Sequence, residues 1–96
     1  MLLALDHDGT YTLDPEFWQQ VVELAQARGH GVVCVSGRDD TAANREALQA
    51  NLPPGLPLLL CNHRVKKAVA REHKLHVDVW IDDFPEGVVA EAAGCS

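Results

Sequence analysis

Apolar and polar residues alternate along this chain in blocks that predict strands and helices in turn. Short apolar runs that end at a polar group are typical of strands buried on both faces of a sheet. Such runs cover residues 2–6, 31–35, 56–61 and 77–81. Between and after them, apolar residues spaced three and four apart or runs rich in helix formers predict helices. The helices start at about residues 15, 40, 65 and 86 and end near residues 29, 50, 73 and 93.

Two of these helices have recognisable starts. Asp14 stands directly before Pro15, which suits an N-cap followed by proline at the first helical position. For the second helix, either Asp39 or Asp40 is the expected cap. Gly29 or Gly31 ends the first helix, and the Pro53-Pro54 pair breaks the chain after the second.

The regular alternation of strand and helix predicts a single α/β domain over residues 1–96. Parallel strands joined by right-handed helical crossovers give a three-layer, Rossmann-like arrangement, with four or five strands and helices on both faces. A chain of 96 residues, 47% of them hydrophobic, suits one modest core. The stretch after the fourth strand is short, so a fifth strand is expected to be absent or supplied by a partner.

Composition also bears on location. The chain has no run of about 20 apolar residues and no signal-like start, so we expect a cytoplasmic protein without a membrane partner. Its three cysteines, Cys34, Cys61 and Cys95, are too widely spaced for a structural zinc site. We expect them to be reduced, with Cys34 and Cys61 in the core.

The net charge of -6 argues against general affinity for nucleic acid, because such binding depends on basic residues that neutralise phosphates. One basic cluster runs against this trend, between residues 63 and 74. Two interpretations of this cluster remain open: it is a solvated helix face, or it is a local contact surface for the end of a nucleic acid.

Polar groups follow each predicted strand, and the ends of parallel strands meet at one edge of the sheet. The groups are Asp6 and Asp8, Ser36, Asn62 and His63, and Asp82 and Asp83. Carboxylates crowded there repel one another by roughly 4 kcal/mol per pair at 4 Å in an intermediate dielectric. A divalent cation would remove this repulsion. Oxygen ligands without grouped Cys or His favour magnesium, Mg²⁺, over zinc.

A metal ion at this edge would allow the neighbouring groups to react with a phosphate ester. A carboxylate can attack phosphorus once the phosphate charge is neutralised, and a second carboxylate can transfer the proton. Ser36 opens a helix-start segment with Gly37 and Arg38, where a hydroxyl and backbone N–H groups can hold phosphate oxygens. A lysine on the third helix would balance the charge.

These residues together resemble the motifs of the haloacid dehalogenase (HAD) superfamily. The stretch Asp6-His7-Asp8-Gly9-Thr10 is similar to its DxDGT first motif, and Ser36 stands where the second is found. Lys66 or Lys67 matches the third motif, and Asp82-Asp83 the acidic fourth. The resemblance spans residues 2–84. The segments after the first and third strands are too short for a cap domain, so a capless member is implied.

The resemblance also implies a role for each residue. Asp6 would be the nucleophile and a magnesium ligand, and Asp8 the general acid and base, with its backbone carbonyl on the metal. Ser36 would bind the phosphoryl group, and Lys66, with Lys67 as the alternative, would be the catalytic lysine. Further expected roles are magnesium binding by Asp82 and Asp83 and substrate contacts by Gly37, Arg38, Lys67 and His63.

The function implied is a magnesium-dependent phosphatase that forms an aspartyl-phosphate. A phosphorylated small molecule or macromolecule is the expected substrate, a nucleic-acid end the alternative, and a second subunit could cover the open site. A non-catalytic binding module with the same fold is the other hypothesis. A signalling receiver domain is rejected, because receivers carry the accepting acid after the third strand, where this chain has Cys61-Asn62-His63.

Overall fold

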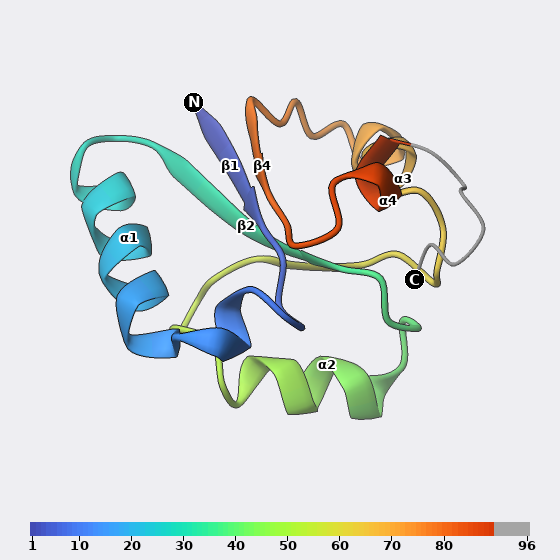
Figure 1. Ribbon diagram of the computed structural model, residues 1–96, viewed down its shortest axis with the longest axis horizontal. Coiled ribbons are helices and arrows are strands. Elements are labelled where there is room, and N and C mark those ends of the chain that lie inside the picture. Colours follow the sequence, from blue (N-terminus) through green and yellow to red (C-terminus); the bar gives the residue numbers. More distant parts are fainter. Residues whose placement is uncertain (90–96) are drawn as a thin grey trace.

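A computed structural model describes residues 1–89 of the chain (Figure 1). Its strands are β1 (Leu2–Leu5), β2 (Gly31–Ser36), β3 (Leu58–Leu60) and β4 (Val79–Ile81). Its helices are the short 3-10 turn η1 (Tyr11–Leu13), α1 (Pro15–Ala27), α2 (Ala42–Gln49), α3 (Lys66–Glu72) and α4 (Glu86–Val89). The predicted order of strands and helices is confirmed. The predicted last helix, to residue 93, extends beyond the described residues.

All four strands are parallel and lie in the order β3-β2-β1-β4. Leu5, near the end of β1, pairs with Cys34 on one side and Ile81 on the other. The register therefore brings the carboxyl ends of β1, β2 and β4 to one edge of the sheet. This edge is where the sequence predicts the polar groups to gather.

Each face of the sheet carries its own hydrophobic core. Alternate residues of a strand point to opposite faces, and β2 divides its side chains in this way. Val32 and Cys34 join the core under α1 and α2, whereas Val33 and Val35 join the core under α3. Figure 1 shows α1 and α2 on one side of the strands and α3 and α4 on the other. The predicted α/β fold with helices on both faces is confirmed.

Cys34 and Cys61 are buried free thiols in these cores, as predicted. Burial raises the pKa of Cys34 to about 12 and that of Cys61 to about 11. Both therefore stay protonated at neutral pH and act as small apolar residues. Cys95 lies outside the described residues.

The helix starts agree with the prediction in one case and differ in the other. Asp14 caps α1, because its Oδ1 accepts a hydrogen bond from the Phe17 N–H at 3.2 Å. The prediction that Asp39 or Asp40 caps α2 is wrong, since Thr41 does so by accepting the Asn44 N–H at 3.1 Å. The Asp40 carboxylate is instead paired with Arg45 at 2.9 Å.

Strand lengths also differ from the prediction. β3 begins at Leu58 and β4 at Val79, each two residues later than the apolar run begins. The apolar residue Val77 packs against the α3-side core although it precedes β4, so its hydrophobicity marks burial and not strand pairing.

Within residues 1–89, no helix has both the length and the apolar character needed to cross a membrane.

Candidate active site

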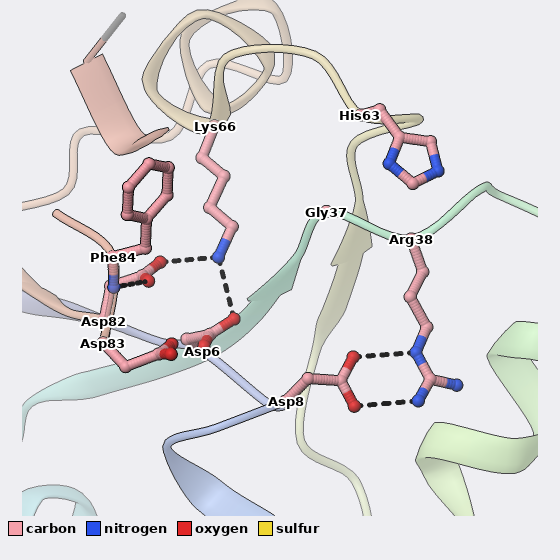
Figure 2. Close-up of a pocket in the computed structure, with 9 residues that line it drawn as sticks. All are labelled: Asp6, Asp8, Gly37, Arg38, His63, Lys66, Asp82, Asp83 and Phe84. Carbon is pink, nitrogen blue, oxygen red and sulfur yellow. Dashed lines mark hydrogen bonds and ion pairs between the residues drawn. The ribbon is translucent and has the colours of Figure 1, made fainter. Parts of the chain in front are cut away.

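A pocket of about 510 Å³ opens at the carboxyl edge of the sheet (Figure 2). Its walls come from the segments that follow all four strands and from the first turn of α3. The lining residues are Asp6, Asp8, Gly37, Arg38, His63, Lys66, Asp82, Asp83 and Phe84. The topology therefore gathers residues that are up to 78 positions apart into one site.

Lys66 lies between two carboxylates at the base of this pocket. Its Nζ is 2.8 Å from Asp6 Oδ1 and 2.5 Å from Asp82 Oδ2. Asp6 follows β1 directly, and its N–H donates to the Ile81 carbonyl at 2.9 Å, which fixes the end of β1 beside the end of β4. Lys66 and Asp6 are each only 6% exposed. A buried cation is thus paired on two sides, as a charge removed from water requires.

The pKa values in this group show how burial and charge compete. Burial raises the pKa of Asp6 to about 6, and the hydrogen bond and charge of Lys66 act against this rise. Burial alone would lower the pKa of Lys66, but its hydrogen bonds to Asp6 and Asp82 outweigh this and raise it. Lys66 therefore remains charged, while Asp6 is easier to protonate than an exposed aspartate.

Three carboxylates of the pocket are close enough to share a cation. Oxygens of Asp6, Asp82 and Asp83 all lie within 4.8 Å of one another. Carboxylate oxygen is the donor that Mg²⁺ and Ca²⁺ prefer, and this group contains no nitrogen or sulfur donor. The donor chemistry of these residues therefore fits a hard divalent cation. The Asp8 side chain is not part of the group.

Thr10 links the two acidic segments, a contact that the sequence did not reveal. The backbone N–H of Asp83 donates to Thr10 Oγ1 at 3.2 Å across 73 positions of sequence. The same hydroxyl lies 3.2 Å from Asp6 Oδ2 and 3.4 Å from Asp83 Oδ1. The turn after β1 thus holds both Asp6 and Asp83. A threonine after Asp-Gly signals a turn but not this partner.

Gly9 lets Asp83 approach that turn closely. Its φ is +81°, and a Cβ at this position would lie 2.6 Å from Asp83 Oδ2. Gly9→Ala is therefore expected to destabilise the fold by about 1–3 kcal/mol and, if the three carboxylates bind Mg²⁺, to weaken that binding, because Asp83 must move. Chemical denaturation and a Mg²⁺ titration followed by calorimetry would measure the two effects.

Gly29→Ala is the matched control for this variant. Gly29 has a φ of +83° but nothing within 4 Å of its would-be Cβ. It should lose stability through backbone strain and keep the Mg²⁺ affinity of the parent. Equal Mg²⁺ affinities in the two variants would show that Gly9 does not matter for the position of Asp83.

On the opposite wall, Asp8 is held by Arg38. The Arg38 Nε and Nη2 donate to the two Asp8 carboxylate oxygens, each at 2.8 Å, as Figure 2 shows. This hydrogen bonding to Arg38 lowers the pKa of Asp8. His7 is buried and stacks on Tyr11, and its Nδ1 lies 3.3 Å from Asp8 Oδ1. Asp8 is thus ionised and tied to the wall of the pocket.

The segments after β2 and β3 hold each other in place. The N–H groups of Cys61 and His63 donate to the carbonyls of Ser36 and Gly37, at 2.9 and 2.7 Å. The Ser36 hydroxyl accepts the Arg38 N–H at 3.2 Å. Gly37, Arg38 and His63 consequently line the pocket, whereas Ser36 is buried behind it and is not a lining residue.

The two adjacent lysines have different surroundings. Lys66 enters the active-site pocket, while Lys67 is exposed and lines a separate pocket on α3. Consecutive helical residues point about 100° apart, so only one of them can face the acids. Phe84, which the sequence analysis did not single out, is 37% exposed and lines the site. Its place directly after Asp82-Asp83 is the signal that could have revealed it.

Comparison of the chain with protein-family models, curated proteins and solved structures gave no match. The arguments for a function therefore come from the pocket itself, with its paired lysine, its group of three carboxylates and its separate Asp8–Arg38 pair.

Proposed function

We propose that this protein is a magnesium-dependent phosphatase of the HAD type that acts through an aspartyl-phosphate on Asp6. The observation that carries the proposal is the bridge of Lys66 between Asp6 and Asp82, in a pocket where Asp83 completes a group of three carboxylates. A structural ion pair would need neither the third carboxylate nor an open pocket.

Asp6, Asp82 and Asp83 would hold the magnesium ion through side-chain oxygens, and the resemblance adds the backbone carbonyl of Asp8. The ion would supply charge neutralisation, so that an anionic carboxylate can approach an anionic phosphate. Every other step belongs to the side chains of the pocket. Lys66 keeps one positive charge at Asp6, which favours the ionised form needed for attack.

In the first step, an Asp6 carboxylate oxygen forms a bond to phosphorus, and the bond from phosphorus to the leaving oxygen breaks. A protonated Asp8 gives its proton to that oxygen. In the second step, Asp8 takes a proton from water, which attacks the phosphorus of the aspartyl-phosphate. Asp6 is thereby restored and inorganic phosphate is released.

Arg38 connects substrate binding to this proton transfer. While Arg38 holds both oxygens of Asp8, the carboxylate stays ionised and cannot act as an acid. A phosphate dianion in the pocket competes for the guanidinium, because bidentate Arg–phosphate pairs are as favourable as Arg–carboxylate pairs. Exchange of Arg38 from Asp8 to the phosphate would release Asp8, which could then take up a proton from solvent and give it to the leaving oxygen.

The experiment that tests the proposal measures hydrolysis of an aryl phosphate with and without Mg²⁺. We expect turnover in Mg²⁺, loss of turnover in EDTA, and recovery when Mg²⁺ is restored. Mg²⁺ should also raise the melting temperature, since an ion that binds only the folded state stabilises it. Beryllofluoride, a phosphate mimic, should add a further increase only when Mg²⁺ is present.

Two outcomes would contradict the proposal. Absence of Mg²⁺-dependent hydrolysis across a broad panel of phosphate esters would refute the hypothesis that the protein is a phosphatase. A melting temperature unmoved by beryllofluoride would favour a non-catalytic module that binds a metal and no phosphate.

A further inference from the structure

A second pocket, of about 370 Å³, lies between α3 and β4. Cationic, aromatic and aliphatic side chains line it together. They are Lys67, Ala70, Arg71, Leu75, His76, Val77, Asp78 and Trp80. A volume of this size is within the range of pockets that hold small ligands. None of its lining residues takes part in the chemistry proposed above.

The cations of this pocket are available to a ligand. Lys67 and Arg71 are four positions apart on α3, so they lie on the same face of the helix, one turn apart. Both are exposed, and within residues 1–89 neither forms an ion pair or side-chain hydrogen bond. The one acid that lines the pocket, Asp78, uses its Oδ2 to accept the Leu2 N–H at 2.8 Å. The pocket is thus suited to an anion, in a chain with a net charge of -6.

Trp80 adds a flat aromatic surface beside these cations. It is partly buried, packs against the core under α3, and also lines the pocket. A tryptophan next to unpaired Lys and Arg is the combination that binds nucleotides, since the ring stacks on a base while the cations contact the phosphate. An anion without a flat group would contact the two cations but could not stack on the Trp80 ring.

The two pockets are neighbours along both elements that form them. On α3, Lys66 lines the active-site pocket and Lys67 the second, and consecutive Cα atoms are about 3.8 Å apart. Trp80 on β4 lines the second pocket, and Asp82, directly after the end of β4, lines the first. The two pockets thus share α3 and the end of β4 as common walls.

We propose that the α3–β4 pocket binds the nucleotide adjoining a phosphorylated end, so that the substrate of the active site is the phosphorylated end of a single-stranded nucleic acid. This rests on the proposed phosphatase function for the first pocket. Lys67 and Arg71 contact the backbone phosphate of that nucleotide, and Trp80 stacks on its base. Because the protein has a net charge of -6, the rest of its surface repels the strand, and binding is limited to the α3–β4 pocket and the active site.

The test uses Trp80 as its own reporter. The chain has two tryptophans, so Trp18→Phe leaves Trp80 as the only one. Adding Asp6→Asn prevents turnover during the titration. Tetradeoxyadenylate with a phosphate at either the 5′ or the 3′ end is added, and Trp80 fluorescence is recorded. We expect saturable quenching with at least one isomer, and weaker binding of the same strand without its terminal phosphate.

Substitutions then locate the binding. Lys67→Ala and Arg71→Ala should each raise the Kd by about tenfold, the effect of losing one charge-assisted contact. Arg28→Ala removes the positive charge of an exposed residue directly after α1, outside both pockets, and should leave the Kd within about twofold. A strand with an abasic site next to the phosphorylated end should bind without quenching Trp80.

Some outcomes would overturn the inference. Equal effects of Arg28→Ala and Lys67→Ala would show only general attraction. Binding of adenosine monophosphate as tight as that of the phosphorylated strand would point to a free nucleotide as the occupant. The phosphatase assay could fail while the phosphorylated strand still binds, and while Lys67→Ala and Arg71→Ala still weaken that binding. This result would contradict the proposed phosphatase function but not the proposed binding site, because the titration needs no turnover.

Discussion

Asp6→Asn is expected to abolish phosphatase turnover, by about a thousandfold or more, while making the metal-free protein more stable. An amide cannot form the aspartyl-phosphate, and loss of a nucleophile removes the whole covalent pathway. The gain in stability has a separate cause. The carboxylate of Asp6 is buried, and Asn places no charge in that position.

The pH dependence of this gain follows from the pKa of Asp6. Burial raises it from 3.8 to about 6, so the folded protein binds the proton more tightly than the unfolded chain does. The contribution of Asp6 to the stability of the parent therefore falls as the pH rises from about 4 to about 6, and stays lower above that range. The advantage of Asp6→Asn should grow over the same range and reach on the order of 3 kcal/mol.

Urea denaturation in EDTA between pH 4 and pH 8 would measure this advantage. Asp8→Asn is the matched control, since it makes the same change in the same pocket at a carboxylate whose pKa is lowered and not raised. It should gain no stability, and the loss of its half-exposed Arg38 pair should cost about 0–1 kcal/mol. Mg²⁺-dependent turnover by well-folded Asp6→Asn would refute the role of Asp6.

Lys66→Met should have the largest effect on stability. It leaves Asp6 and Asp82 facing one another in a buried site without their shared cation, and removing one partner of a buried ion pair costs about 3–5 kcal/mol. Turnover should also fall, by about a hundredfold or more, because a positive charge beside the reacting phosphate is lost. Denaturation and aryl-phosphate assays would measure the two losses.

The loss of stability should depend on pH and on metal. Without the lowering effect of Lys66, the pKa of Asp6 should rise above its parent value of about 6. Protonation of Asp6 then relieves the repulsion already above pH 6, so the deficit of Lys66→Met should shrink as the pH falls toward about 6. Saturating Mg²⁺ should also reduce it by replacing the missing charge. Lys67→Met, one position along the same helix but exposed, should change stability by less than about 0.5 kcal/mol. Similar losses in both variants would mean that the buried pair does not stabilise the fold.

The sequence predicted the fold because its signals are local. Apolar runs, the Asp14-Pro15 cap and the helix spacings act within a few residues, and the parallel order follows from their alternation. Thr41 was missed as the cap of α2 because several possible caps stand side by side, and only the path of the preceding loop decides among them. That loop is fixed by Asn62, whose Oδ1 accepts the Asp40 N–H at 2.7 Å.

The sequence predicted which residues form the candidate site better than it predicted how they contact one another. Parallel strand ends gather at one edge, so Asp6, Asp82 and Asp83 could be brought together from the sequence. The Thr10 contact with Asp83 and the Asp8 pair with Arg38 depend on loop conformation, which no local pattern encodes. The choice between Lys66 and Lys67 likewise needed the rotation of α3, which is set by its packing against the sheet.

The strand order gives the acids of the pocket unequal mechanical support. β1 is hydrogen-bonded between β2 and β4, whereas β4, at one end of the described sheet, is three residues long and pairs with β1 alone. Local opening therefore needs less free energy at Asp82 and Asp83 than at Asp6, and backbone amides should exchange with solvent in that order. The protein thus places one carboxylate at the end of a strand that is paired on both sides, and the other two at the end of a strand that is paired on one side.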